Sequence, residues 1–293
     1  MRVLVLGVTG MLGSTVFRRL TEDAQHQVFG TMRSASGLRY FSELNYENLL
    51  CNVDVLEYDN LIAVFETVRP DVVINCVGLI KQLSDAKNPL SALPINAMLP
   101  HRLASICSLV GARLVHISTD CVFNGEKGMY TEEDTSDATD LYGKSKYIGE
   151  VIDSSNAVTL RTSIIGHELN SEASLVDWFL CQEGAVKGFK KAVFSGLPTV
   201  ELADVINNYV LPNPSLSGLY HVSVEAIDKY SLLKLIATVY KKNIEITIDE
   251  QLCIDRSLDS SKFQNEFGYK IPSWEYLINK MYRTKIKGIT EYV

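Results

Sequence analysis

The chain has 293 residues, a formal net charge of −7, 46% hydrophobic residues and 22% charged residues. This balance is typical of a soluble globular protein with room for one large domain or two smaller ones, and it argues against a nucleic-acid or anionic-membrane surface. No apolar run approaches the ~18 residues of a membrane span, and the first residues do not form a secretory signal. The six cysteines are scattered without a CxxC pair, so we expect reduced thiols, no metal site and a cytoplasmic location.

The first half of the chain alternates short apolar runs with amphipathic segments. Strands are predicted at Val3–Leu6, Gln27–Gly30, Val72–Asn75, Leu114–Ser118 and Val158–Ser163. Helices are predicted at Met11–Leu20, Tyr58–Val68 and Asn96–Val110. A βαβ series of this kind predicts an α/β fold with a doubly wound, parallel, Rossmann-type sheet.

The rhythm changes beyond Gly166, where prolines interrupt the chain. The predicted elements there are a strand at Leu219–Val222, a helix at Leu232–Tyr240, a strand at Ile244–Ile248 and a helix at Trp274–Met281. We therefore expect a cofactor-binding Rossmann domain over residues 1–166 and a smaller α/β substrate lobe over residues 167–293. The segment near 195–222 is a candidate to return to the first domain. Ligands of open α/β sheets bind at the carboxyl edge of the strands, and we expect the lobe to cover that edge.

Three glycines, Gly7, Gly10 and Gly13, follow the first strand and open the first helix. Glycines there allow a tight turn and let the backbone approach a pyrophosphate at the helix N-terminus. The spacing is GxxGxxG rather than the usual GxGxxG, and an ordinary strand–turn–helix glycine cluster is the alternative. The position directly after the first strand favours a dinucleotide site.

The residues after the second strand indicate which dinucleotide binds. NAD sites place a carboxylate there for the ribose 2′-hydroxyl, whereas NADP sites place a cation. Here Arg33 and Ser34 follow the strand, and no acidic residue occurs between the end of the strand and Glu43. We therefore predict NADP(H) as the preferred cofactor and NAD(H) as the second choice, with a solvated loop role for Arg33 as the alternative.

Tyr142 and Lys146 are four residues apart, which places both side chains on one face of a helix. A tyrosine with a pKa of about 10 becomes an acid or base near neutral pH only if about 4 kcal/mol stabilises its phenolate. An ammonium about 5 Å away supplies roughly 3 kcal/mol at an effective dielectric of about 20. The pair is therefore a candidate catalytic acid, and a pair on a helix surface is the alternative.

Several segments resemble the extended short-chain dehydrogenase/reductases. They are Gly7–Gly13 (GVTGMLG), Asn75–Gly78, Asn96, Ser118–Gly125 (STDCVFNG) and Tyr142–Lys146 (YGKSK). Within that superfamily the chain resembles the dTDP-4-dehydrorhamnose reductases, which reduce the 4-keto group of nucleotide-linked 6-deoxysugars in deoxysugar and polysaccharide biosynthesis. The resemblance covers nearly the whole chain and implies a nucleotide-sugar substrate, without identifying the nucleotide or the hexose. It is also compatible with a homodimer.

The resemblance implies a role for each matching residue. Tyr142 is the general acid, Lys146 lowers its pKa and holds the nicotinamide ribose, and Thr119 orients the carbonyl. The implied cofactor-binding residues are Gly7, Thr9, Gly10, Met11, Leu12, Gly13, Arg33, Ser34, Asp54, Val55, Asn75, Cys76, Val77, Gly78, Asn96, Tyr142 and Lys146. The implied substrate-binding residues are Ser118, Thr119, Asp120, Cys121 and Arg256. A helix cap or loop hydrogen bond is the alternative for Asn96 and Asp54, and a surface ion pair is the alternative for Arg256.

Cys121 departs from the reductase pattern, which commonly has tyrosine at this position. GDP-fucose synthases and plant-type rhamnose synthases carry a cysteine there as an acid/base for epimerisation, together with a histidine or lysine. His167 is the nearest candidate partner, but Leu175 occupies the best-matching position, so the epimerase pair is incomplete and Cys121 is interpreted mainly as a small apolar wall residue. Two alternatives to a simple reductase therefore stay open: a 3,5-epimerase/4-reductase that uses Cys121, and a non-catalytic NADP-binding regulatory subunit.

Overall fold

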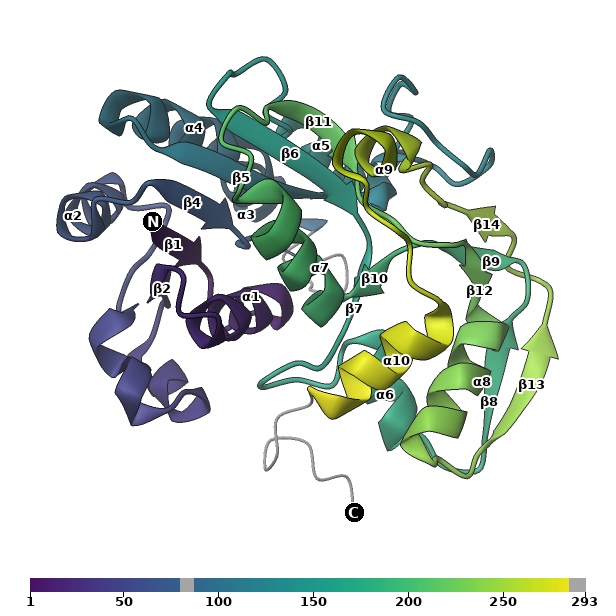
Figure 1. The fold of residues 1–293 in the computed structure, drawn as a ribbon. Helices are drawn as coiled ribbons and strands as arrows, with labels where there is room; N and C mark the ends of the chain where they lie inside the picture. The colour runs from purple at the N-terminus through teal and green to yellow at the C-terminus, as the bar shows by residue number, and fades with distance from the viewer. Residues whose placement is uncertain (80–86, 285–293) are drawn as a thin grey trace. The chain divides into compact units, whose positions relative to one another are not determined.

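Seven strands form the main sheet of the computed structural model, which describes residues 1–79 and 87–284 (Figure 1). Their order is β11-β6-β5-β4-β1-β2-β3. The pairs β5–β4, β4–β1, β1–β2 and β2–β3 are parallel. Since β1 lies inside the sheet and β2 and β4 flank it, the chain is wound in both directions from β1, as the sequence predicted.

The chain divides into two units. Unit 1 comprises Met1–Ser118, Thr139–Leu160 and Ala203–Leu219. Its elements, including those that cross into unit 2, are β1 (Arg2–Leu6), α1 (Met11–Glu22), β2 (Gln27–Thr31), η1 (Ala35–Tyr40), η2 (Glu43–Asn48), β3 (Leu49–Leu50), α2 (Tyr58–Val68), β4 (Val72–Asn75), α3 (Pro89–Ala92), η4 (Leu93–Met98), α4 (Leu99–Val110), β5 (Arg113–Thr119), α5 (Leu141–Ile148), β6 (Ala157–Thr162), α7 (Thr199–Val205), η6 (Ile206–Val210) and β11 (Gly218–His221).

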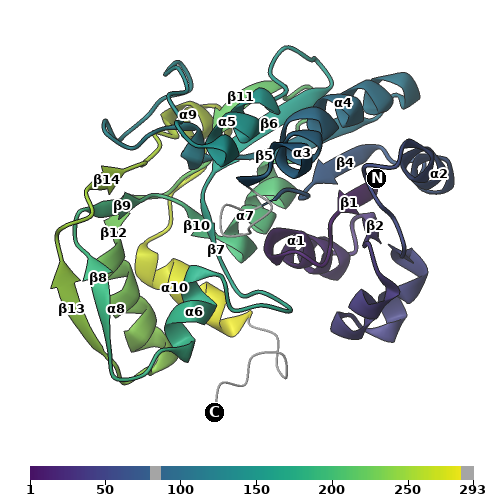
Figure 2. The ribbon, with the colours of Figure 1, turned by 180° about the vertical axis from the view of Figure 1, so that it is seen from behind.

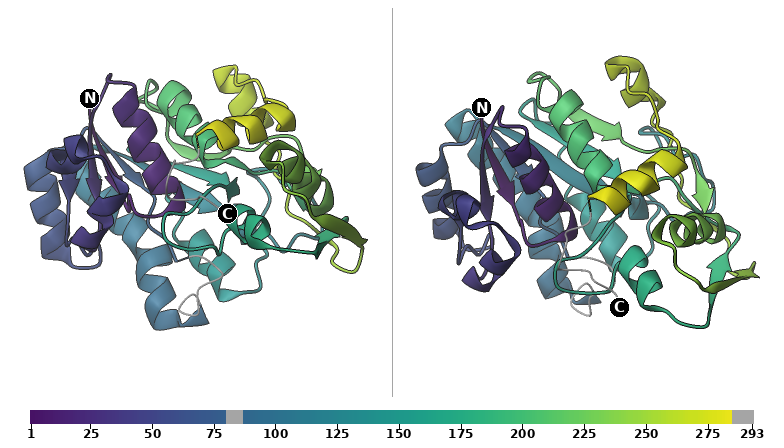
Figure 3. Two further views of the ribbon diagram at one scale, coloured as in Figure 1. Left: turned by 90° about the horizontal axis from the view of Figure 1, so that it is seen from below. Right: turned by 60° about the horizontal axis from the view of Figure 1, so that its bottom comes forward.

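Alternating side chains of β1 build the core on both faces of the sheet in unit 1. Leu4 and Leu6 pack with buried residues of α2 and α4. On the other face lie α1 and the end of α7 with η6, which are joined by hydrogen bonds from Arg19 to Asp204 of α7 and from Asn207 of η6 to Asp23, the residue after α1. Figure 2 brings α3, α4 and α5 to the front, and Figure 3 (left) shows α1 in purple and α4 in blue on opposite sides of the strands.

Unit 2 comprises Thr119–Ala138, Arg161–Leu202 and the chain from Tyr220. Its further elements are η5 (Asp120–Val122), β7 (Ile164–Ile165), α6 (Leu175–Cys181), β8 (Ala185–Phe189), β9 (Ala192–Phe194), β10 (Leu197–Pro198), β12 (Ile227–Asp228), α8 (Lys229–Tyr240), β13 (Glu245–Asp249), β14 (Ile254–Asp255), α9 (Ser261–Phe267) and α10 (Trp274–Arg283). The sheets β12-β9-β14 and β13-β8 belong to this unit. It is thus a mixed α/β unit with short strands.

The predicted helix over Asn96–Val110 differs from the structure. Helical backbone already begins at Pro89, capped by the Asn88 side chain, and passes through the π-helical turn η4 before α4. Pro94 lacks a backbone N–H, so the regular ladder is interrupted at η4, although the chain continues as a helix. The sequence interpretation therefore placed the start too late.

None of the helices within the described ranges has both the length and the apolar character that crossing a bilayer requires.

Candidate functional site

The turn between β1 and α1 contains glycines that a larger residue could not replace. Gly7 has a φ of +82°, in the left-handed region. A Cβ on Gly13 would lie 2.2 Å from the Gly7 carbonyl oxygen, so the first turn of α1 lies directly against the loop. The N-cap residue Gly10 makes no side-chain cap. Thr9, Met11 and Leu12 lie in the same turn, whose backbone amides suit an anionic group at a helix N-terminus.

The segment after β2 exposes the residues that were predicted to read the ribose. Arg33 is exposed, and no hydrogen bond or ion pair of its guanidinium falls within the described ranges. The Ser34 hydroxyl caps η1 by accepting from the Ser36 amide. Asp54 accepts from the Leu56 amide at 2.9 Å, and Val55 is buried in the core. Arg33 therefore lies where a 2′-phosphate could use it, whereas Asp54 holds a local turn.

The end of β4 supplies polar and backbone groups beside β1. Asn75 is fully buried, accepts from the Val77 amide at 3.1 Å and contacts His116 Nδ1 at 3.2 Å through its amide nitrogen. Burial raises the pKa of the Cys76 thiol to about 12, so this thiol is neutral. With Gly78, these residues form a wall of uncharged groups at the carboxyl end of the strand.

Lys146 is a buried cation of unit 1. Its side chain is nearly inaccessible, and Nζ donates to the Ile117 carbonyl on β5 at 2.7 Å. Burial lowers its pKa to about 8, and the Glu150 carboxylate opposes that shift. His116, behind it on β5, has a pKa held well below its usual value by burial and by Lys146, so this imidazole is neutral. The ammonium thus lies in a low-dielectric site where its field is strong.

Tyr142 lies one helical turn before Lys146 on α5 and is half-buried. The N-cap of the helix is Asp140, whose carboxylate accepts from the Gly143 amide at 2.8 Å. The helix therefore starts at Leu141, and Tyr142 is in its first turn. The i,i+4 spacing puts the phenol and the ammonium on the same face.

Asn96 lies in the π-helical turn η4. Its side chain accepts from the Leu79 amide at 2.9 Å and donates to the Leu79 carbonyl and to the Ser145 hydroxyl. The Asn96 backbone passes so close to Gly149 that a Cβ there would lie 1.9 Å from the Asn96 carbonyl. These contacts match the hydrogen-bonding alternative that the sequence left open, and they tie α5 to η4.

Ser118, predicted to contact substrate, uses its hydroxyl inside the fold. The hydroxyl donates to Glu150 Oε1 at 2.6 Å, and both residues are buried. Sequence reasoning did not single out Glu150, although its position four residues after Lys146 was the available signal.

In unit 2, Thr119 begins a turn that holds the other predicted substrate residues. Its hydroxyl accepts from the Cys121 amide and donates to Asp120 Oδ1, both at 3.1 Å. Burial raises the pKa of Asp120, against the opposing effects of Arg256, Cys121, Thr119 and Lys229. Three predicted residues therefore meet in one short turn beside two cations.

Arg256 binds this turn rather than presenting an open guanidinium. Nε donates to the Phe123 carbonyl at 2.7 Å, and Nη2 donates to the Asn124 carbonyl at 3.4 Å. Nη1 lies 3.8 Å from Cys121 Sγ. These three contacts spread the guanidinium along residues 121–124, so Arg256 positions the turn.

Lys229 is a functional candidate that sequence reasoning missed. It is half-buried at the start of α8, with Nζ 4.2 Å from the centroid of the Phe194 ring. Burial lowers its pKa to about 8, while Asp120 and Cys121 oppose that shift. A cation in the first helical turn opposes the macrodipole, and this placement was the signal in the sequence.

Two of the histidines, His167 and His221, make hydrogen bonds within unit 2. His167 bonds Asp177 through Nδ1 at 2.6 Å and the Tyr240 hydroxyl through Nε2 at 2.7 Å. Burial and Arg161 lower the pKa of His221 to about 4. No cluster suited to a metal ion occurs in the part of the chain that the structure describes.

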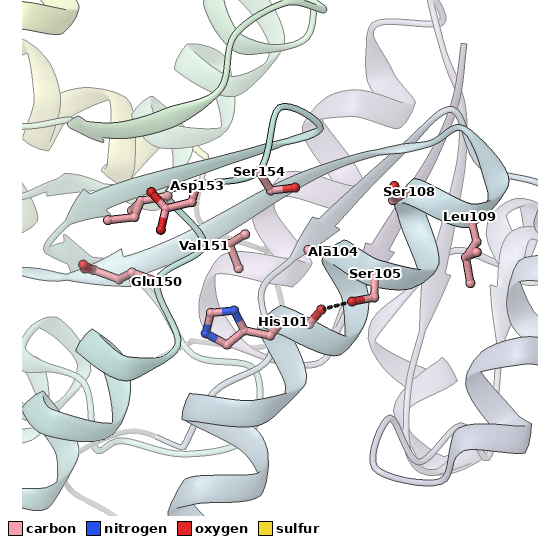
Figure 4. Close-up of a pocket in the computed structure, with 10 residues that line it drawn as sticks. His101, Ala104, Ser105, Ser108, Leu109, Glu150, Val151, Asp153 and Ser154 are labelled. Carbon is pink, nitrogen blue, oxygen red and sulfur yellow. Dashed lines mark hydrogen bonds between the residues drawn. The ribbon is translucent and has the colours of Figure 1, made fainter.

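A surface pocket of about 600 Å³ lies between α4 and the segment after α5 (Figure 4). It is lined by His101, Ala104, Ser105, Ser108, Leu109, Glu150, Val151, Ile152, Asp153 and Ser154. None of the predicted site residues is among these.

Comparison with known proteins gives one family and several relatives. The sequence model of the family described as RmlD substrate binding domain matches residues 1–286. Methionine adenosyltransferase 2 subunit beta of Xenopus tropicalis is 25% identical over 322 residues, which cover 97% of this chain and 91% of that protein. The probable low-salt glycan biosynthesis reductase Agl14 of Haloferax volcanii is 33% identical over 151 residues, which cover 51% of this chain and 48% of that protein.

Among solved structures, dTDP-4-dehydrorhamnose reductase from Bacillus anthracis in complex with NADP is similar with a TM-score of 0.78. The match covers 97% of this chain and 99% of that chain at 23% identity. A likeness at this identity shows a shared fold.

Proposed function

Because this chain belongs to the RmlD substrate binding domain family, we propose that it is an NAD(P)-dependent oxidoreductase of nucleotide sugars. It reduces the 4-keto group of a nucleotide-linked 4-keto-6-deoxyhexose, with NADPH preferred over NADH. The observation that carries this proposal is the buried ammonium of Lys146, held by the Ile117 carbonyl one helical turn after Tyr142. A fixed cation in that place makes the tyrosine a usable acid near neutral pH.

The residues of unit 1 fit a dinucleotide. The close contact between Gly13 and Gly7 leaves no room for a Cβ, and the N-terminus of α1 has no side-chain cap, so a pyrophosphate can meet backbone amides there. Arg33 and Ser34 would bind a 2′-phosphate. The solved relative from Bacillus anthracis is a complex with NADP, which supports this preference. When bound, the dinucleotide supplies the hydride.

The side chains of this chain supply the proton and the orientation. Tyr142 donates its phenolic proton to the carbonyl oxygen, and Lys146 stabilises the phenolate that results. The Thr119 hydroxyl orients the carbonyl, and Asp120 and Cys121 contact the sugar. We place this reaction in deoxysugar biosynthesis for surface polysaccharide, in the cytoplasm. The similarity to a protein named a glycan biosynthesis reductase supports the biosynthetic part of this proposal.

Turnover with a panel of substrates tests this function. Purified protein is mixed with NADPH and dTDP-, UDP- or GDP-linked 4-keto-6-deoxyhexoses, and loss of NADPH absorbance is followed. We expect one nucleotide series to be consumed at enzymatic rates, with a 4-hydroxy product identified by NMR. Absence of turnover across the panel, with NADPH still bound, would favour the alternative of a non-catalytic NADP-binding regulatory subunit, to which the similarity to a protein named subunit beta of methionine adenosyltransferase 2 gives only weak support.

A second candidate function has support from unit 2. Cys121 and Asp120 both interact electrostatically with Lys229, which supplies the second acid/base group that an epimerase needs. His167, the partner considered from the sequence, already bonds Asp177 and Tyr240 with its two ring nitrogens. A 3,5-epimerase/4-reductase would therefore use Cys121 with Lys229.

Solvent isotope incorporation separates the two candidates. In D₂O, a simple reductase yields a product without deuterium at C3 or C5, whereas an epimerase introduces it there. Deuterium that disappears in both Cys121→Ser and Lys229→Met would establish the epimerase, because serine is a much weaker acid than a thiol. A product without deuterium at C3 and C5 would reject the epimerase and retain the simple reductase as the function.

A further inference from the structure

Lys146 has few groups that can compensate its charge. Its Nζ bonds a backbone carbonyl, which is a dipole and carries no net charge. Among the described residues, the ionisable groups that interact electrostatically with it are Glu150 just beyond its own helix, Cys76 just after β4 and His116 on β5, and Tyr142 lies one turn earlier on the same helix. Cys76 and His116 are both neutral near pH 7, for the reasons given above.

Glu150 is the carboxylate among these groups, and its position is tightly defined. It follows Lys146 by four residues, and its amide bonds the Tyr147 carbonyl, which continues the turn at the end of α5. Its side chain is 7% exposed. Ser118, the residue after Ile117, donates to its carboxylate at 2.6 Å. The same stretch of β5 therefore holds the ammonium through Ile117 and the carboxylate through Ser118.

We propose that Glu150 is a positioning residue that keeps Lys146 protonated, and that the Ser118 hydroxyl fixes its carboxylate for this purpose. The role rests on the proposed function, because a charged Lys146 matters only if Tyr142 acts as the proton donor. Glu150 itself touches neither the substrate nor the cofactor. Its negative charge lowers the free energy of the ammonium form of Lys146 in a buried site that would otherwise favour the neutral amine.

The direction of the effect follows from the charges. Burial favours the neutral amine and lowers the pKa of Lys146 to about 8, and the Glu150 carboxylate opposes that shift. Removing the negative charge must therefore lower the pKa of Lys146 further. Less of the enzyme then carries the ammonium at a given alkaline pH, and the alkaline limb of the activity profile moves to lower pH.

Glu150→Gln is the direct test, because glutamine keeps the shape and still accepts a hydrogen bond from Ser118. If the pKa of Lys146 falls by about one unit, kcat/KM falls about threefold at pH 7.5 and about eightfold at pH 8.5, with little change at pH 6. Glu66→Gln is the matched control, since this carboxylate is exposed on α2 and its removal changes net charge equally. Glu150→Asp keeps the charge and should retain a near-normal profile.

A second measurement needs no turnover. Carbon-13 NMR of lysine-labelled protein follows the titration of Lys146, whose signal is assigned by its loss in Lys146→Met. We expect the Lys146 midpoint to fall in Glu150→Gln and to stay near its wild-type value in Glu66→Gln. An unchanged midpoint in Glu150→Gln would overturn the role of Glu150. If the wild-type protein reduces no sugar nucleotide but Glu150→Gln still lowers the Lys146 midpoint, the proposed function is rejected and the charge pairing of Glu150 with Lys146 is kept.

Discussion

A half-buried tyrosine one turn before a buried lysine has a specific electrostatic consequence. The lysine ammonium lies in a low-dielectric site and bonds a strand carbonyl, so its charge is little screened by water. In the proposed reaction this ammonium stabilises the phenolate that Tyr142, on the same helical face, forms when it gives up its proton. The chemistry we propose therefore depends on one hydroxyl and one ammonium.

Tyr142→Phe removes only the hydroxyl. We expect NADPH and sugar-nucleotide binding to persist, because the ring and the helix are unchanged. Turnover should fall by roughly two to four orders of magnitude, which is the usual contribution of a positioned general acid. Steady-state kinetics with calorimetric binding checks this, and a near wild-type rate would assign the proton donor elsewhere.

Arg33 is the residue that we expect to select the cofactor. A charge-assisted contact to a 2′-phosphate contributes roughly 1.5–3 kcal/mol. Arg33→Ala should therefore weaken NADPH about tenfold to a hundredfold and leave NADH nearly unchanged. Arg33→Lys keeps the charge but loses the planar guanidinium, so its NADPH affinity should lie between those of the wild type and Arg33→Ala. Equal losses for both cofactors in calorimetry would speak against this role.

At the scale of an element, the β1–α1 turn is defined by the contact between Gly13 and Gly7. Gly13→Ala would put a Cβ 2.2 Å from the Gly7 carbonyl oxygen, so the helix must shift away from the loop. We expect a clear loss of stability and at least a tenfold loss of NADPH affinity.

Gly10→Ala is the matched control for that substitution. Its Cβ would lie 3.5 Å from the same oxygen, an ordinary contact distance. Chemical unfolding of the two variants should therefore separate them clearly. Similar losses at both positions would show that the clash is not the cause.

For the whole molecule, two buried neutral histidines predict sensitivity to acid. His221 is fully buried, its Nε2 lies 3.3 Å from Arg161 Nη1, and burial together with that guanidinium lowers its pKa to about 4. The unfolded chain takes up a proton below about pH 6.5 while the folded protein does not until about pH 4. The contribution of His221 to the free energy of unfolding is therefore complete above pH 6.5. As the pH falls toward 4, the protein loses about 3 kcal/mol of that contribution.

Urea unfolding across that pH range measures this effect. We expect the free energy of unfolding to fall steeply between pH 6.5 and 4, with His116 adding to the slope since its pKa is also lowered. His221→Gln should be less stable at pH 7 and should lose less on acidification. An identical pH dependence in this variant would assign the acid sensitivity to other groups.

The family and the fold class predicted from the sequence are confirmed. Val72–Asn75 and Tyr58–Val68 have the predicted bounds, and most other elements differ by one to three residues at an end. Only the entry into α4 was substantially wrong, at the prolines around η4. The functional roles of the glycine turn, Thr119, Tyr142 and Lys146 stay predictions.

Periodicity, glycine spacing and the Tyr142/Lys146 interval are local properties, so the sequence by itself determined the strands, the turn and the helix face. Only the tertiary structure decided that Glu150 meets Ser118, 32 positions away, that Arg256 holds the Phe123 carbonyl, 133 positions away, and that Lys229 faces Asp120. Such contacts depend on how strands and helices pack, and no short-range pattern encodes the partner of a buried charge. Burial likewise decided which of these groups are charged, because desolvation is a property of the folded chain.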